Sequence, residues 1–356
     1  GEPRFETPSF NRSNAFEAVG EECRAVREAV GLNEIHNFGK FEVTGDGATQ
    51  WLDYMMAGRI PAVGRLTLAP MLSPKGRIIG DFTISRLADN HYQLTSSYGA
   101  QIYHQRWFEQ HLPESGVSIR NISDSRIGLQ IAGPKAREVL SQVTNLDLST
   151  AAFPFLSVQQ GEVGLCDAIV QRVSYTGDLG YEVYVNSTQA VSLYHTLSQA
   201  GEAFGMRPFG MRAMMSLRLE KGFGSWLREY SPDYTPLETG LDRFVRYDKA
   251  ADFIGKAAAL ADREQGASRC LATFVVEVED TDVNADEPIW KDGKIVGFVT
   301  SGGYAHWAKQ SVAIGFLPPE LIVEGAAVEI EILGEKRPAK VITQPLFDPL
   351  SERMRA

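Results

Sequence analysis

The stretch Ser174–Val185 places a tight turn directly before a strictly alternating strand, and it constrains the possible folds more than any other segment. The turn reads Thr-Gly-Asp-Leu-Gly, in which the glycines permit a positive φ and the Asp can bond nearby backbone. Along Gly180–Val185 the apolar side chains share one face, which leaves Glu182 and Tyr184 on the other. The pattern predicts a sheet with one buried face. On pattern alone, Glu182 is either a solvated hairpin residue or a displayed functional carboxylate.

The composition is that of a globular chain with a large core. Its 356 residues are enough for two or three domains, and 44% of them are apolar. A formal net charge of −10, without any run of Lys or Arg, argues against nucleic acid or an anionic membrane as a partner. No stretch approaches the roughly 20 apolar residues that span a bilayer, and the N-terminus is polar, so a cytoplasmic location is predicted.

Signatures of several common sites are missing from the sequence. Cys23, Cys166 and Cys270 are widely spaced and form neither a disulfide framework nor a zinc-binding pattern, so no metal site is predicted. No G-x-G-x-x-G motif follows a strand, and there is no P-loop. The chain therefore carries no sequence fingerprint for FAD, NAD or a nucleoside triphosphate.

Helical and strand periodicities alternate through most of the chain, which predicts an α+β fold. The clearest helix is expected over Asn14–Val30, with apolar residues three and four apart and Asn14 as its capping residue. From about Cys270 onward the pattern changes to short alternating strands, with Asp292-Gly293 as a two-residue hairpin turn. We therefore predict two domains, residues 1–268 and a small β-barrel over residues 269–356.

Asp81 lies in a second informative strand. Two strands are expected to form a hairpin about Pro74-Lys75-Gly76, because Pro and Gly set the backbone of a turn directly. Alternation along the second strand places Asp81 with Thr83 and Ser85 on its more polar face. Asp is a poor strand former, so its presence needs an explanation. It is either a solvated or salt-bridged surface group or a functional carboxylate.

Several motifs, in chain order, resemble those of the aminomethyltransferase family: the T-protein of the glycine cleavage system and the folate-binding portions of dimethylglycine and sarcosine dehydrogenases. The motif Y-T-G-[DE]-x-G-[YF]-E is matched by Tyr175, Thr176, Gly177, Asp178, Gly180, Tyr181 and Glu182. The motif M-L-x-x-x-G-x-[IV]-x-x-D is matched by Met71, Leu72, Gly76, Ile78 and Asp81. Further matches are S-L-R-L-E-x-G at 216–222 and V-T-S-G at 299–302.

Two positions place the chain within this resemblance. T-proteins usually carry two adjacent Asp residues where this chain has Gly80-Asp81, which is closer to the dimethylglycine and sarcosine dehydrogenases. Folate-binding iron–sulfur assembly proteins of the same fold carry Lys-Gly-Cys where this chain has Lys221-Gly222-Phe223, so that branch is not favoured. The resemblance implies a three-lobed folate-binding fold, with two α+β lobes within residues 1–268 and a C-terminal β-barrel.

The resemblance also implies roles for particular residues, with tetrahydrofolate as the cofactor. Glu182 would bind the pterin ring, and Asp81 would be the catalytic residue beside the folate nitrogens. Arginines near the S-L-R-L-E helix would meet the tail carboxylates, although Arg218 could instead be a buried partner of Glu220 or Asp178. The remaining expected folate contacts are Arg212, Tyr175, Tyr304 and Tyr98, the last of which could equally be structural.

These roles predict a tetrahydrofolate-dependent one-carbon transferase that accepts a methyl or methylene unit from a methylated amine or a related small donor. Because no flavin fingerprint is present, oxidation of a donor would need a separate flavoprotein oxidase subunit. The alternatives are a non-catalytic folate-binding module and a subunit of a flavin-dependent amine dehydrogenase. The presence of both Asp81 and Glu182 favours an enzyme.

Overall fold

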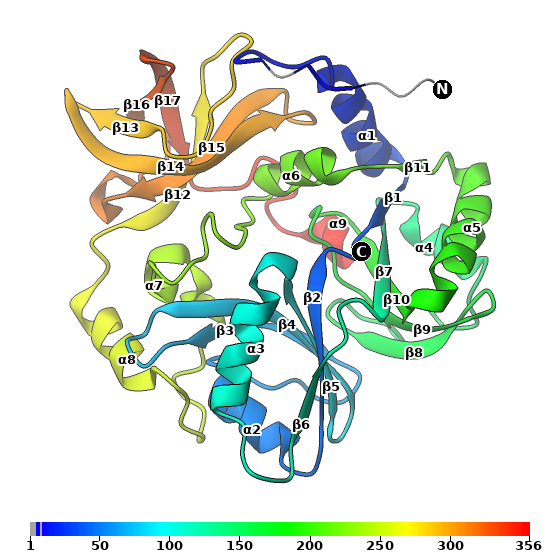
Figure 1. Ribbon diagram of the computed structural model, residues 1–356. Helices are drawn as coiled ribbons and strands as arrows, with labels where there is room; N and C mark the ends of the chain where they lie inside the picture. Colours follow the sequence, from blue (N-terminus) through cyan, green and yellow to red (C-terminus); the bar gives the residue numbers. More distant parts are fainter. Residues whose placement is uncertain (1–4, 8) are drawn as a thin grey trace.

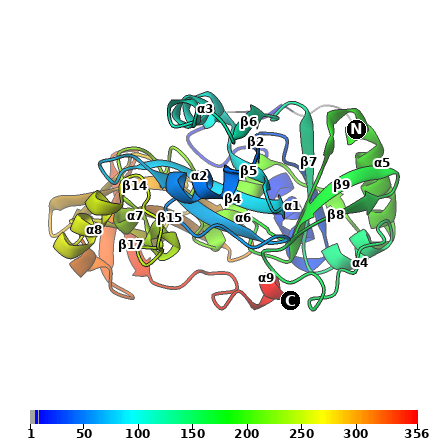
Figure 2. The same ribbon diagram turned by 90° about the horizontal axis from the view of Figure 1, so that it is seen from below.

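A computed structural model describes residues 5–7 and 9–356 and shows an α+β fold of three units around a common centre (Figure 1). The units are a six-stranded sheet, a five-stranded sheet and a closed barrel. Seen from below, the barrel and the six-stranded sheet lie at opposite ends of a flat molecule (Figure 2). The expected three-lobed arrangement with a C-terminal barrel is therefore confirmed.

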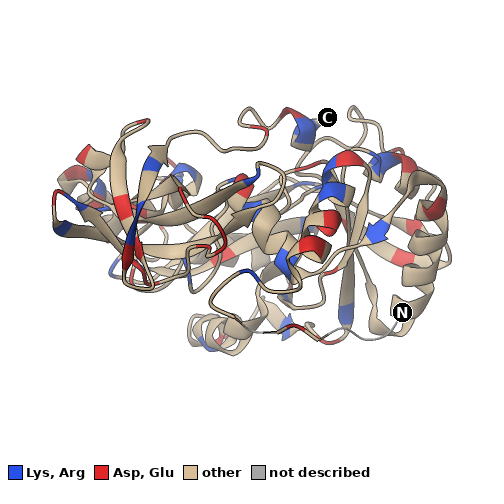
Figure 3. Ribbon diagram, turned by 90° about the horizontal axis from the view of Figure 1, so that it is seen from above, with Lys and Arg blue, Asp and Glu red and all other residues tan. Residues whose placement is uncertain are grey.

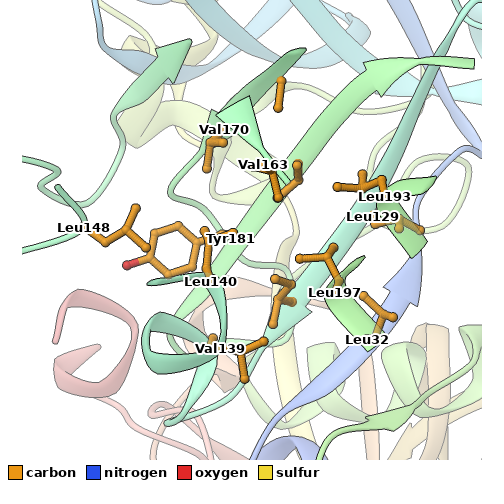
Figure 4. Close-up of a cluster of buried hydrophobic side chains, with 14 of the residues drawn as sticks. Leu32, Leu129, Val139, Leu140, Leu148, Val163, Val170, Tyr181, Leu193 and Leu197 are labelled. Atoms are coloured by element: carbon orange, nitrogen blue, oxygen red, sulfur yellow. The ribbon is translucent and has the colours of Figure 1, made fainter. Parts of the chain in front are cut away.

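The six-stranded sheet has the order β11-β1-β7-β10-β9-β8. In that order the strands are Arg207–Pro208, Gly31–Glu34, Arg126–Ala132, Gly180–Asn186, Cys166–Gln171 and Val158–Val163. Helices α4 (Ala136–Ser141) and α5 (Ala190–Gly201) contribute to the apolar cluster on one face of the sheet. Figure 4 shows part of this cluster, including Tyr181 of β10 and Leu193 and Leu197 of α5.

Strand β10 divides its residues between two environments, as its alternation predicts. Tyr181, Val183 and Val185 are fully buried in the cluster beside α4 and α5. Glu182 and Tyr184 point to the opposite face because successive side chains of a strand alternate. Tyr184 is nevertheless fully buried, so this second face is also covered.

The five-stranded sheet has the order β3-β4-β5-β2-β6. These strands are Leu66–Leu72, Ile78–Ala88, His91–Ser97, Phe38–Thr44 and Ser118–Asn121. Its apolar face packs against α2 (Ala48–Met55) and α3 (Gln101–Gln110), with Phe82 and Ile84 of β4 in the buried cluster. The intervening residues Asp81 and Thr83 remain partly exposed, as predicted, whereas Ser85, expected on the same face, is fully buried.

The barrel closes in the order β12-β15-β14-β13-β16-β17. Its strands are Cys270–Val276, Gln310–Leu317, Lys294–Ala305, Pro288–Lys291, Ala327–Ile332 and Glu335–Ile342. The short helix α7 (Pro236–Thr239) and α8 (Lys256–Gln265) precede it in the chain. The barrel begins at Cys270, and the division of the chain between residues 268 and 269 stays a prediction.

A buried network of charges ties the first helix and the chain's last segment to the motif turn. Helix α1 (Phe16–Glu28) carries Arg27, which pairs with Glu220 at 2.8 Å and with Asp178 at 3.4 Å. Arg353 of α9 (Glu352–Arg355) pairs with the same Asp178 at 3.0 Å. Glu220 ends α6 (Met211–Glu220), which packs on both α1 and β14. Asp178 is therefore a structural residue of the turn.

The helix lengths and the placement of charged residues agree with what the composition predicts. Over the described residues, no helix is both long and apolar enough to cross a membrane. In the view of Figure 3, acidic and basic residues are interspersed over all three units. That view shows no surface dominated by Lys and Arg.

Candidate functional site

The polar faces of the two open sheets meet at the centre of the molecule. Tyr184 of β10 lies in a small buried cluster with Ile35 and Ile169, and Phe38 and Leu87 from the five-stranded side pack against it. The charge on Lys40 of β2 also acts on Glu182 of β10. Each sheet thus turns its main core outward, toward its helices, and presents a strand carrying an acidic residue to the other sheet.

Glu182 is held at this interface with little access to solvent. It is 9% exposed, and the Tyr184 hydroxyl donates a hydrogen bond to its Oε2 at 2.8 Å. Burial raises the pKa of Glu182 to about 7, although Tyr184 and the Lys40 ammonium both act to lower it. Glu182 therefore titrates near neutral pH and carries a full charge only above that value.

Two glutamines flank Glu182 on the neighbouring strands. Gln130 of β7 and Gln171 of β9 are its direct cross-strand partners, so all three side chains project from one face. Both glutamines are 0% exposed, and among the described residues neither the amide oxygen nor the amide nitrogen of either has a hydrogen-bond partner. An unsatisfied buried polar group costs about 1–3 kcal/mol. A polar ligand that reached Glu182 would supply partners to both amides.

Lys40 provides the positive charge nearest to Glu182. It is 0% exposed, and its Nζ donates to the carbonyls of His36 at 3.0 Å and Phe38 at 2.7 Å. Burial lowers the pKa of Lys40 to about 8, against the opposing effect of Asp124 and Glu182. At neutral pH the ammonium form therefore still predominates and favours ionised Glu182.

Asp81 stands on β4 beside two tyrosines. Burial raises the pKa of Asp81 to about 6, and among the described residues no side chain hydrogen-bonds its carboxylate. Burial also raises the pKa of Tyr230 and Tyr175, and the Asp81 charge adds to both shifts. Asp81 is thus ionised at neutral pH without a side-chain partner among the described residues, and its charge acts on two phenols that stay neutral. Its pKa is higher than that of an ordinary Asp.

The loop that follows α6 holds these tyrosines in place. Tyr175 donates to the carbonyl of Gly224 at 2.6 Å, and Tyr230 lies in the same loop. Glu229 fixes the loop from inside by accepting from Ser225 N at 2.8 Å and from Thr300 Oγ1 at 2.6 Å. The barrel strand β14 therefore supports the loop beside Asp81.

Arg218 is part of that support, which corrects the expectation that it binds a ligand's tail. It is 1% exposed, and its guanidinium donates to Glu229 at 3.2 Å, to Phe223 O at 2.9 Å and to Ser301 Oγ at 2.7 Å. The alternative of a buried structural partner holds, but the partner is Glu229. Glu220 and Asp178 pair with Arg27 instead.

Two known protein domains match most of the chain. Residues 3–249 match the GCVT N-terminal domain, and residues 269–348 match the glycine cleavage T-protein C-terminal barrel domain. The chain belongs to the glycine cleavage T-protein family. Its sequence covers both domains of that family.

Relatives within the T-protein family differ in length. Human mitochondrial dimethylglycine dehydrogenase is 38% identical over 351 residues, which cover 98% of this chain and 40% of that protein. The aminomethyltransferase of Geobacillus sp. (strain WCH70) is 33% identical over 336 residues, or 93% of this chain and 91% of that one. The chain thus spans about 40% of the length of the dimethylglycine dehydrogenases it matches.

A solved structure shares this T-protein fold over almost the whole chain. The crystal structure of glycine cleavage system aminomethyltransferase T from Bartonella henselae has a TM-score of 0.85 and 24% sequence identity. The match covers 97% of this chain and 94% of that one. The arrangement of two sheets and a barrel is therefore the family's fold.

The residues expected to contact folate do not all lie at one site. Arg212 and Tyr304 line a separate hollow of about 560 Å³ between α1, α6 and the barrel. There Arg212 pairs with Glu6, and Tyr304 packs on Phe16 with a ring separation of 5.0 Å. Tyr98 is 40% exposed and donates to Asp124 at 3.3 Å. The charge of Asp124 raises the pKa of Lys40, as the charge of Glu182 does, so Tyr98 lies nearer to the Glu182 side.

Several central residues were missed by sequence reasoning. Gln171 and Tyr230 carry no motif of their own, and Gln130 begins a family-like Q-I-A-G-P-x-A step to which only a packing role was assigned. Strand register and the loop after α6 bring the three residues to the site. Lys40 could have been found, since Lys is a poor strand former and stands here next to Phe41 within a strand. Gln171 is also conspicuous, because it is a polar residue that ends an apolar run.

Gly80 has a physical reason to lack the side chain that T-proteins usually carry there. A Cβ at this position would lie 2.6 Å from both His104 Nε2 and Phe82 Cε2, and both rings are buried. His104 Nε2 is fixed by the carbonyl of Ile79 at 3.0 Å, and its Nδ1 by Ser96 Oγ at 3.0 Å. Burial lowers the pKa of His104 to about 4, so it is neutral.

Gly80→Ala is expected to lower the free energy of unfolding by about 1–3 kcal/mol, because the new methyl overpacks a rigid core. Urea unfolding followed by circular dichroism measures this. The matched control is Gly99→Ala, since a Cβ at Gly99 meets no atom within 4 Å. Equal unfolding midpoints for the two variants would contradict the packing role assigned to Gly80.

Proposed function

We propose that this protein binds tetrahydrofolate between its two open sheets and transfers a one-carbon unit to it. The observation that carries the proposal is the pairing of Glu182, flanked by two partnerless buried amides, with Asp81 on the facing sheet. A flat heterocycle rich in N–H donors and ring acceptors would satisfy both amides and the carboxylate. Membership of the T-protein family and the motif resemblance agree with this ligand.

Each residue has a role that follows from its surroundings. Ionised Glu182 accepts two hydrogen bonds from the pterin's amino group and the adjacent ring nitrogen. When bound, tetrahydrofolate supplies the nitrogen that receives the one-carbon unit. Asp81 stabilises positive charge at that nitrogen or takes its proton, since a carboxylate with a pKa of about 6 serves either purpose at neutral pH.

The donor is proposed to be a methylated amine, or a related small molecule that gives a methyl or methylene unit. The relatives named dimethylglycine dehydrogenase support this class. Those proteins are longer than this chain, which covers 40% of the human one. Because the sequence carries no flavin fingerprint, we propose that any oxidation of the donor takes place on a flavoprotein partner. Tyr98 and Tyr175 are proposed to contact the folate.

The test is turnover of tetrahydrofolate with a panel of methylated amines, methylated sulfonium compounds and methoxy compounds, each with and without an added flavoprotein oxidase. Transfer from at least one amine donor is the expected result. Tetrahydrofolate binding without transfer from any donor would favour a non-catalytic folate-binding module. Absence of binding would overturn the proposal.

Glu182 makes stability depend on pH in a defined direction. The pKa of Glu182 is about 7 in the folded protein and lies near its ordinary value of 4.5 in the unfolded chain. Between these two pH values the folded state therefore binds more protons than the unfolded state. The free energy of unfolding should therefore fall as pH rises from about 5 to 7. At 1.36 kcal/mol per pKa unit, Glu182 contributes about 2 kcal/mol to the fall between pH 5 and 7.

Urea unfolding of wild type and Glu182→Gln at several pH values isolates this contribution. The variant cannot ionise at this position, so its stability should decline less over the same range. Asp81 also has a raised pKa and should account for part of the decline that remains. Parallel pH profiles would contradict the burial effect assigned to Glu182.

A further inference from the structure

A cavity of about 620 Å³ lies at the edge of the six-stranded sheet. Its walls are formed by β1 and the turn after it, by β7, by the start of α5 and by the segment 208–211. Neither Glu182 nor Asp81 is among its lining residues. The volume falls within the roughly 300–1,000 Å³ of small-molecule sites.

Two amide oxygens at this cavity have no donor. Asn33 is 5% exposed, and its Nδ2 donates to Phe209 O at 2.5 Å, which fixes the orientation of the amide. Its Oδ1 is left without a partner, as is the Oδ1 of Asn37. Both residues line the cavity. Buried acceptors without donors favour a ligand that brings N–H groups.

The remaining lining is apolar and carries little positive charge. Val191, Tyr194 and Met211 are 69%, 45% and 45% exposed around it, although they are large apolar residues. Among the described residues that line the cavity there is no Lys or Arg. Glu34 Oε1 and His36 Nδ1 lie 3.0 Å apart there. The walls therefore combine apolar contact with oxygen acceptors.

We infer that this cavity is a second binding site and that it takes a small amine with an apolar, preferably aromatic, body. The ammonium or amine donates to the oxygens of Asn33 and Asn37, and the body covers the exposed apolar side chains. An acid of the same shape is disfavoured, because its carboxylate would lie beside the Glu34 carboxylate and the acceptor oxygens of Asn33 and Asn37. This inference does not depend on folate binding.

Asn33 of the cavity lies in the same cross-strand row of the sheet as Glu182. Asn33 lies directly opposite Gln130, and Gln130 lies directly opposite Glu182. The three polar side chains therefore form one row across β1, β7 and β10.

Calorimetric titration with 2-phenylethylamine, 2-phenylethanol and 3-phenylpropionate tests the inference on the whole chain near neutral pH. Saturable binding of one equivalent of the amine, with at least tenfold weaker binding of the acid, is expected. The alcohol should fall between them, since it donates one hydrogen bond without charge. Equal binding of amine and acid, or no saturable binding of the amine, would overturn the inference.

Two variants locate the site. Asn37→Ala removes one acceptor, and Val191→Trp fills the mouth from an exposed position where folding is not at risk. Each is expected to weaken amine binding at least tenfold. Val323→Trp is the matched control, because Val323 is an exposed apolar residue next to the barrel, 58% exposed. Unchanged affinity in Val191→Trp would place the amine elsewhere and contradict the assignment.

Discussion

Asp81→Asn is expected to reduce one-carbon transfer about 10²–10⁴-fold while leaving tetrahydrofolate affinity within about threefold of wild type. The amide keeps the size of the side chain but carries no charge and takes no proton. Because Asp81 has no side-chain partner among the described residues, its replacement breaks no ion pair. The loss should therefore appear in kcat, measured as turnover with the best donor of the panel.

Thr83→Val is the control for this substitution. Thr83 lies on the same polar face of β4, two residues further along, and is likewise partly exposed. Its replacement should change kcat by no more than a few-fold. A similar loss in both variants would show that the face of the strand matters rather than the Asp81 carboxylate.

Glu182→Ala is expected to weaken tetrahydrofolate binding by at least about 10²-fold. The variant loses a pair of charge-assisted hydrogen bonds, each worth about 1.5–3 kcal/mol, and leaves pterin donors unpaired. In the wild type, affinity should rise as pH increases through about 7, because Glu182 must ionise to accept both bonds. That pH dependence should be lost in the variant, and calorimetry measures both effects.

Glu162→Ala serves as the control, since Glu162 is an exposed carboxylate on β8 of the same sheet. Its affinity for tetrahydrofolate should equal that of wild type at every pH. Retention of wild-type affinity in Glu182→Ala would remove the pterin contact from the account. Unchanged pH dependence would do the same.

Local patterns predicted the strands and turns well, because they depend on residues close in sequence. The alternation along β10 correctly separated its apolar residues from Glu182 and Tyr184. The turn at Pro74-Lys75-Gly76 is present with Gly76 at a φ of 72°, and Asp292-Gly293 adopts positive φ at both positions. The first helix was placed correctly, although it starts at Phe16 and Asn14 instead accepts from Thr7 N.

Partners distant in sequence were beyond local patterns. The capture of Arg218 by Glu229 needs the loop after α6 to fold back, and its bond to Ser301 needs the barrel in place. The burial of Glu182 depends on a second sheet covering a face that the strand pattern alone describes as polar. Motif resemblance pointed to the importance of Glu182 and Asp81. Arg212 and Tyr304, which were expected to contact folate as well, line a different hollow.

The central claim is that one folate molecule bridges the two open sheets, and a crystal structure of the complex with tetrahydrofolate tests it most directly. The account predicts the pterin's amino group on Glu182, the Gln130 and Gln171 amides paired with the ring, and the reactive nitrogens turned toward Asp81. A pterin bound in the cavity beside Asn33, or in the hollow that holds Arg212 and Tyr304, would contradict it.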